Sequence, residues 1–109
     1  MENHTRLLKI EKQIRAIKRE LMEIGEMRPG SLTCQKRKRK EMYGEYWQLS
    51  YTHKNKGHTE YIRKAHAASV KHQIDNYSHF RALISKWITL AITHAQLKLK
   101  SIRDVELGS

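Results

Sequence analysis

The N-terminal quarter of the chain has apolar residues at alternating spacings of three and four. The stripe consists of Leu7, Ile10, Ile14, Ile17, Leu21 and Ile24, and charged residues occupy the other faces. This period predicts an amphipathic helix over residues 5–25, and it also matches almost three heptads of a coiled coil. Gly25 and Pro29-Gly30 end the pattern. The stripe either packs on a second helix of the same chain or pairs with another copy, and the pattern does not decide between the two.

The middle of the chain changes to a period of two. In the aromatic stretch from Tyr43 to Thr52, Trp47, Leu49 and Tyr51 share one face, and Tyr46, Gln48 and Ser50 share the other. A polar, glycine-containing loop over residues 53–57 follows, and residues 58–62 are suited to a return strand. We predict a β-hairpin with a five-residue loop. Its core face is expected to include Tyr61 as well as Trp47, Leu49 and Tyr51.

Residues 64–103 form the longest helical pattern, without proline or glycine. One apolar stripe consists of Val70, Ile74, Tyr77, Ile84, Ile88, Ala91 and Ala95, and a second consists of Phe80, Leu83, Trp87, Leu90 and Leu97. A break is expected near Asp75-Asn76. Because the combined apolar face is wide for one partner, we predict self-association through the helices. The predicted fold is mainly α, a single domain over residues 1–109 in which a basic loop and β-hairpin (residues 28–62) separate two helices.

Charge singles out the middle segment. The chain has 22 Lys and Arg against 11 Asp and Glu, a formal net charge of +11. Ten of the basic and three of the acidic residues lie between residues 28 and 64, so this segment holds +7 of the total. Such an excess attracts polyanions: nucleic acid, an anionic membrane surface or an acidic protein.

The predicted binding residues are the cations of this segment and one aromatic side chain. They are Lys36, Arg37, Lys38, Arg39 and Lys40, which are consecutive, with Lys54, Lys56, Arg63, Lys64 and Tyr46. Cations on a loop and a hairpin suit the repeat of a phosphate backbone, and Tyr46, on the face away from the core, is placed to stack on an unpaired base. The plain alternative is a solvated basic loop without a ligand.

Other classes of function find little support. A single cysteine, Cys34, excludes an intramolecular disulfide, and no apolar run reaches the roughly 18 residues that span a bilayer, so we expect a cytoplasmic protein without a membrane partner. None of the seven histidines is four residues from another, so no metal site is predicted. Neither a phosphate-binding glycine loop nor a nucleophile motif is present. We predict no cofactor and no enzymatic activity.

Three blocks carry a resemblance to a known family: residues 29–32 (PGSL), residues 43–51 (YGEYWQLSY) and residues 73–83 (QIDNYSHFRAL). Their order over residues 28–97 resembles an uncharacterised family of small prokaryotic proteins, known only as a domain of unknown function and often encoded near transposase-like genes. The resemblance implies a hairpin followed by a long helix. The chain departs from the family where Cys34 stands alone in place of a cysteine cluster, and where Glu45 replaces the usual proline.

Taken together, these features predict a non-enzymatic nucleic-acid-binding accessory protein of a mobile genetic element, acting as a helical homodimer. Recognition would rest on phosphates rather than on base edges. The alternative is a protein-interaction module, an inhibitor or adaptor, that docks its basic face on an acidic protein.

Overall fold

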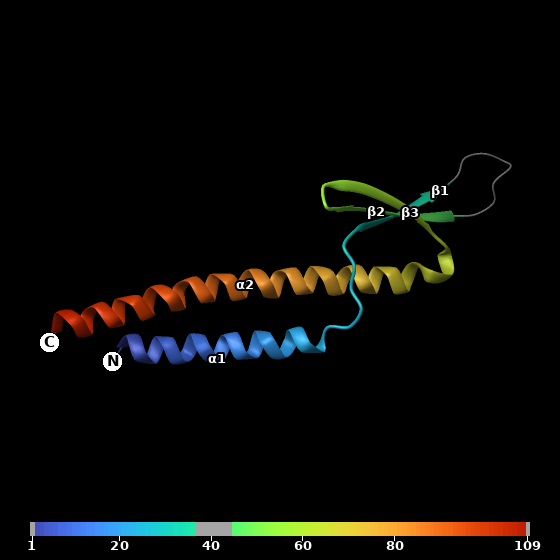
Figure 1. The fold of residues 1–109 in the computed structure, drawn as a ribbon. Coiled ribbons are helices and arrows are strands. Elements are labelled where there is room, and N and C mark those ends of the chain that lie inside the picture. Colours follow the sequence, from blue (N-terminus) through green and yellow to red (C-terminus); the bar gives the residue numbers. More distant parts are fainter. Residues whose placement is uncertain (1, 37–44, 109) are drawn as a thin grey trace. The chain divides into compact units, whose positions relative to one another are not determined.

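Two helices and a small antiparallel sheet make up the computed structural model, which describes residues 2–36 and 45–108 (Figure 1). The elements are α1 (Glu2–Glu23), β1 (Ser31–Lys36), β2 (Glu45–His53), β3 (Lys56–Ile62) and α2 (Lys64–Gly108). The prediction of a mainly α fold is confirmed. The chain divides into a helical unit, residues 1–24 and 80–109, and a sheet unit, residues 25–79. That the whole chain is one domain stays a prediction.

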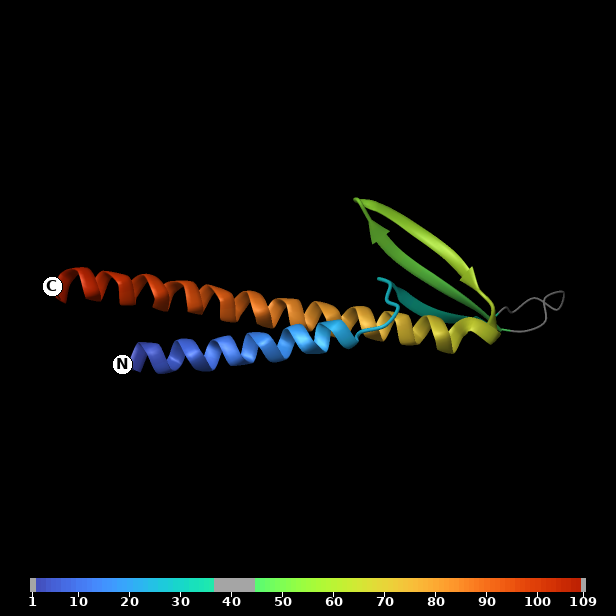
Figure 2. The same ribbon diagram turned by 60° about the horizontal axis from the view of Figure 1, so that its bottom comes forward.

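In the helical unit, α1 and the later part of α2 lie side by side in opposite directions (Figures 1 and 2). Ile10 and Ile17 of α1 are buried, as are Leu83 and Leu97 of α2. The predicted stripe of α1 therefore packs on the chain's own second helix, and its pairing with another copy stays a prediction. The helix begins three residues before the predicted start and ends two residues before the predicted end.

The sheet has the strand order β1-β2-β3, with both neighbouring pairs antiparallel. The first strand was not predicted, because residues 28–40 were expected to form a turn and a basic loop. Leu32 and Cys34 pair with Leu49 and Trp47, so the short stretch from Ser31 to Lys36 follows the same alternation as β2. Two apolar residues beside a run of cations gave too weak a signal for a strand.

The β2–β3 turn corrects the predicted hairpin. His53 pairs with Lys56, so only Lys54 and Asn55 form the connection, with φ angles of 52° and 64°. Two central residues with positive φ are the mark of a type I′ turn, which suits the twist of paired strands. The predicted five-residue loop is wrong, and the difference moves the register by one residue. Tyr61 consequently lies on the face opposite Leu49 rather than on the core face.

The long helix begins at Lys64 as predicted and continues to Gly108, five residues beyond the predicted end. The expected break near Asp75-Asn76 is absent. Polar side chains of this part of α2 instead form hydrogen bonds with Glu26, in the segment that precedes the sheet. Asn76 Nδ2 donates to the Glu26 carbonyl at 2.8 Å, and Gln73 Nε2 donates to the Glu26 carboxylate at 3.0 Å. The Arg28 amide in turn donates to the Gln73 carbonyl at 3.2 Å.

The core of the sheet unit lies between the sheet and the first turns of α2. Leu49, on the central strand, has no exposed surface, and Ala67 and Val70 of α2 are also buried. Gly30 passes directly over Leu49 with a φ of +147°, where a Cβ would lie 2.5 Å from Leu49 Cδ1. Glycine is therefore required at this position for two reasons: the positive φ angle and the lack of space for a Cβ. Over residues 2–36 and 45–108, neither helix is long and apolar enough to cross a membrane.

Candidate nucleic-acid interface

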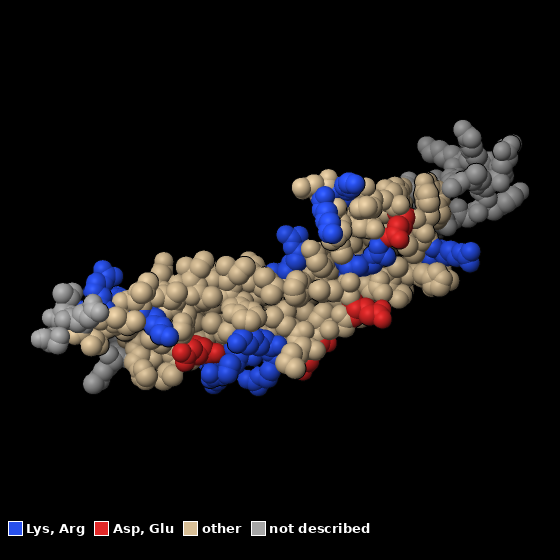
Figure 3. Space-filling model, in the orientation of Figure 1, with Lys and Arg blue, Asp and Glu red and all other residues tan. Residues whose placement is uncertain are grey.

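Basic side chains lie at both ends of the sheet (Figure 3). Lys36 pairs with Glu45 and Trp47 pairs with Ile62, so Arg63 and Lys64 follow the end of the sheet at which β1 ends. Lys54 and Lys56 lie at the opposite end, roughly 23 Å away along β2 at about 3.3 Å per residue. The hairpin thus brings only two of its four predicted cations to the end where the basic run begins. Arg37, Lys38, Arg39, Lys40 and the side chain of Lys36 lie outside the described residues.

The two faces of the sheet differ in chemistry. The face away from α2, here called the outer face, is formed by Ser31, Thr33, Tyr46, Gln48, Ser50, Thr52, Thr59 and Tyr61. These are hydroxyl, amide and phenol side chains, and within the described residues none of them is acidic. Glu60 belongs to the other face because it pairs with Leu49. A polyanion can therefore approach the outer face without meeting a carboxylate of the described strands.

Two tyrosines lie next to each other on the outer face. The ring centroids of Tyr46 and Tyr61 are 5.6 Å apart with an interplanar angle of 60°, an edge-to-face arrangement. Tyr61 is 72% exposed, whereas Tyr46 is half-buried. The contact leaves the Tyr61 ring largely open to solvent while its partner supports one side of it. An exposed ring held in this way is a surface on which an unpaired base can stack.

The opposite face carries a separate cluster around Arg28. Its guanidinium forms an ion pair with Glu60 and lies 5.3 Å from the centre of the Tyr51 ring, which is stacked on His58 at 4.9 Å. The Arg28 Nε atom is buried and has no hydrogen-bond partner among the described residues. Since its charge is matched by Glu60, Arg28 contributes to packing of the sheet unit rather than to the basic surface.

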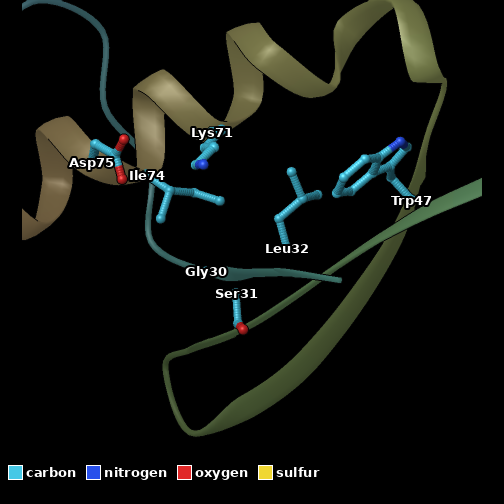
Figure 4. Close-up of a pocket in the computed structure, with 7 residues that line it drawn as sticks. All are labelled: Gly30, Ser31, Leu32, Trp47, Lys71, Ile74 and Asp75. Carbon is cyan, nitrogen blue, oxygen red and sulfur yellow. The ribbon is translucent and has the colours of Figure 1, made fainter. Parts of the chain in front are cut away.

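A groove of about 330 Å³ lies between the strands and α2 (Figure 4). Leu32 and Ile74 point toward each other across it, and the Trp47 ring lies beside Leu32. The ring nitrogen of Trp47 is directed away from Leu32 and is buried without a partner among the described residues. Lys71 and Asp75 also line the groove. Its lining is mainly apolar, so it offers a hydrophobic surface with one cation and one anion beside it.

One titratable pair lies in the helical unit. His94 Nε2 and Glu11 Oε1 are 3.0 Å apart, and this hydrogen bond holds the pKa of Glu11 below its ordinary value. The charges of His94, Arg15 and Lys98 act in the same direction, while partial burial opposes them. The pair joins α1 to α2. Across the described residues, no three His, Cys, Asp or Glu side chains are grouped so that they could hold a metal ion.

A family model matches residues 7–72, more than half of the chain, and its description is a domain of unknown function, DUF6788. The chain belongs to the DUF6788 family. The match spans most of α1, the sheet and the first turns of α2. It includes two of the three blocks that suggested the resemblance, and the third lies wholly beyond it. The resemblance is confirmed at this level; prokaryotic origin, transposase context and the family's cysteine cluster stay predictions. No curated protein and no solved structure matches the chain.

In this DUF6788 protein, sequence reasoning missed Tyr61 as a surface residue. Tyr46 was assigned correctly to the face away from the core, whereas Tyr61 was expected beside Leu49. The signal that would have placed it is the Lys54-Asn55 pair. Asn tolerates positive φ better than most residues do, so a two-residue turn was available without glycine at either central position.

Proposed function

We propose that this DUF6788 protein is a non-enzymatic nucleic-acid-binding accessory protein, and that the outer face of its sheet binds single-stranded segments. The observation that carries the proposal is the Tyr46–Tyr61 pair, with its exposed Tyr61 ring on a face without a described carboxylate. Base stacking on such a ring is tolerant of sequence, in line with the absence of a motif for base readout.

The cations supply the second part of the proposed mechanism. Lys54 and Lys56 at one end of the sheet and Arg63 and Lys64 at the other are separated by the outer face. A strand that crosses the outer face would have phosphates near both ends, and each neutralised phosphate releases condensed counterions. Lys36, the first residue of the basic run, closes β1 at the same end of the sheet as Arg63 and Lys64, and the other four cations of the run lie outside the described residues.

The proposal includes self-association through the helices. A dimer would carry two outer faces, and both could bind the same nucleic-acid strand, which would raise the overall affinity. The role in a mobile element and the cytoplasmic location rest on the family resemblance and on composition, and they stay predictions.

Fluorescence anisotropy with labelled single-stranded DNA, single-stranded RNA and duplex DNA tests the proposal. Stacking contributes roughly 1–3 kcal/mol per base, so Tyr61→Ala should weaken single-strand binding about 5- to 150-fold. Tyr61→Phe keeps the ring and should bind nearly as wild type does. Duplex binding should change little with either variant, because its bases are already stacked on one another.

The contribution of charge is measured in the same assay across a salt series. Changing residues 36–40 to alanine should lower the salt slope by about 3–4 for single strands, at about 0.7 per phosphate. A matched control removes five exposed cations of the helical unit, Lys9, Lys12, Arg19, Lys86 and Lys100. If this control variant weakens binding as much as the basic-run variant does, the affinity depends on the net charge of the protein and not on where the cations lie.

Wild-type protein that binds none of the three nucleic acids at low salt would overturn the proposal. The basic surface would then be assigned to an acidic protein partner. Wild-type affinity in Tyr61→Ala for single strands would refute the stacking mechanism alone, and binding would be attributed to phosphates only.

A further inference from the structure

The later part of α2 carries a second apolar stripe that α1 does not cover. Ile88, Ile92, Leu99 and Ile102 are 54%, 55%, 65% and 50% exposed. With the exposed Ala95 they follow one another at spacings of four, three, four and three. This is the spacing of the interface positions of a coiled coil. All five residues belong to the helical unit.

The stripe is distinct from the one that packs on α1. Buried and half-buried residues of α2 in the helical unit include Leu83, Trp87, Leu90, His94 and Leu97, which follow one another at spacings of four, three, four and three. At about 100° per residue, the centres of the two stripes are separated by roughly 140° around the helix axis. The exposed stripe therefore lies on a side of α2 that faces away from α1, and α1 leaves it open to another helix.

We infer that this stripe is the self-association surface of the protein, and that its partner is the α2 helix of a second copy in antiparallel orientation. A two-helix coiled coil requires each helix to present apolar residues at alternating spacings of three and four. Two copies of α2 meet this requirement, because each presents the same stripe. The inference deepens the self-association that is part of the proposed function, and it does not depend on nucleic-acid binding.

Charge selects the orientation. In a parallel, in-register pair, Lys98 of one copy would lie beside Arg103 of the other across the edge of the seam, and like charges there repel. In an antiparallel pair centred between Thr93 and His94, Lys98 faces Ala91 of the second copy instead. Arg103 then faces Ala82, so the flanks contain no pair of like charges.

The same antiparallel register gives complementary shapes along the seam. Ile88 meets Leu99 of the second copy, and Ile92 meets Ala95, so large side chains lie opposite small or flexible ones. Moving the register by one heptad toward the C-terminus would bring Lys98 next to Lys98 of the second copy. The charges thus favour one register as well as one orientation.

Disulfide trapping tests the orientation directly. In a Cys34→Ser background, Ile88→Cys and Leu99→Cys are made separately and then oxidised alone and as a mixture. A disulfide requires Cα atoms about 4.4–6.8 Å apart. The antiparallel register predicts covalent dimers in the mixture and few in either variant alone. Covalent dimers of each variant with itself would show a parallel pair and overturn the inference.

Sedimentation velocity tests the surface without any crosslink. Wild type should shift from monomer toward dimer as the concentration rises through tens of micromolar, and added salt should favour the dimer by screening the net charge. Ile92→Lys should raise the dissociation constant at least tenfold. Met22→Lys, at an 86% exposed position of α1, adds the same charge outside the stripe and should leave association unchanged.

Circular dichroism and thermal unfolding serve as the folding control, and both lysine variants should keep the wild-type fold because both positions are exposed. A wild-type chain that stays monomeric to several hundred micromolar at high salt would overturn the inference. Equal weakening by Ile92→Lys and Met22→Lys would do so as well, because repulsion alone would then explain the effect. None of these readouts contains nucleic acid, so they can fail while binding by the outer face succeeds.

Discussion

Gly30 and Leu49 should be energetically coupled, because the backbone of one passes over the side chain of the other. A Cβ at residue 30 would lie 2.5 Å from Leu49 Cδ1 and 3.3 Å from the Ser50 carbonyl oxygen. Leu49 has no exposed surface and lies on the central strand, so it has little room to move. In addition, the φ of +147° is a conformation that alanine rarely adopts.

The magnitude follows from these two effects. Overpacking costs about 1–3 kcal/mol and an unsuitable φ costs about 1 kcal/mol or more, so Gly30→Ala should destabilise the sheet unit by about 2–4 kcal/mol. Leu49→Ala should cost about 2–5 kcal/mol through the lost burial and the cavity. In the double variant the contact with Cδ1 disappears, while the strained φ and the approach to Ser50 persist. The combined loss should therefore be smaller than the sum by about 1–3 kcal/mol.

Urea unfolding followed by the fluorescence of Trp47, in a Trp87→Phe background, measures these values in the sheet unit. Gly57→Ala is the matched control, because a Cβ there meets nothing within 4 Å, and it should change stability by less than about 0.5 kcal/mol. Strictly additive losses in the double variant would refute the clash. A Gly30→Ala variant as stable as Gly57→Ala would refute both the clash and the strain.

Two further predictions concern the turn and the helix pair. Replacing Lys54-Asn55 with Asn-Gly, the preferred pair for a type I′ turn, should stabilise the protein by about 1 kcal/mol, and an unchanged or lower melting temperature would contradict the assigned turn. Because Glu11 has a lowered pKa in the folded state, its contact with His94 adds stability above the ordinary pKa of 4.5 that is lost as the pH falls through the folded value. Thermal unfolding of wild type and Glu11→Gln should therefore differ most above pH 4.5 and converge as the pH falls below it, and a difference that is constant with pH would exclude this origin.

Helical periodicity predicted most of the fold. The alternation of three and four in α1, and the long pattern free of proline and glycine in α2, placed both helices within a few residues. Such patterns are local and extend over many turns, so one misleading residue does little harm. Asn76 shows the limit: a turn-forming residue suggested a break, but its side chain satisfies the Glu26 carbonyl and the helix continues.

The sheet was harder to predict because its pairing is not local. The apolar residues on the inner side of β1 are Leu32 and Cys34, and its strand character depends on their partners Leu49 and Trp47, which lie 17 and 13 residues later in the chain. Tyr61 depends on the register, which in turn depends on whether Lys54 adopts a positive φ. The alternation within a strand does not determine its register against the preceding strand. An error of one residue in the register therefore assigns every side chain of the strand to the wrong face of the sheet.

The candidate site shows the same division. Composition located the excess of charge, but the strand register was needed to separate Lys54 and Lys56 from Arg63 and Lys64. The exposed stripe of α2 contains Ile88 and Ala95 from one predicted stripe, together with Ile92, Leu99 and Ile102, which belonged to neither. Which apolar residues stay open depends on where α1 packs, and the periodicity of α2 alone does not contain that information.

The two edge strands of the sheet have a consequence for the tendency of the protein to aggregate. Within the described residues, neither β1 nor β3 has a strand on its far side, so each presents unpaired backbone donors and acceptors. Such edges can template aggregation by pairing with other chains. A net charge of +11 opposes the approach of many copies to one another, which protects the edges as long as the charge stays uncompensated. A polyanion that neutralises the charge would remove this protection, so complexes near charge balance should be those in which the protein precipitates.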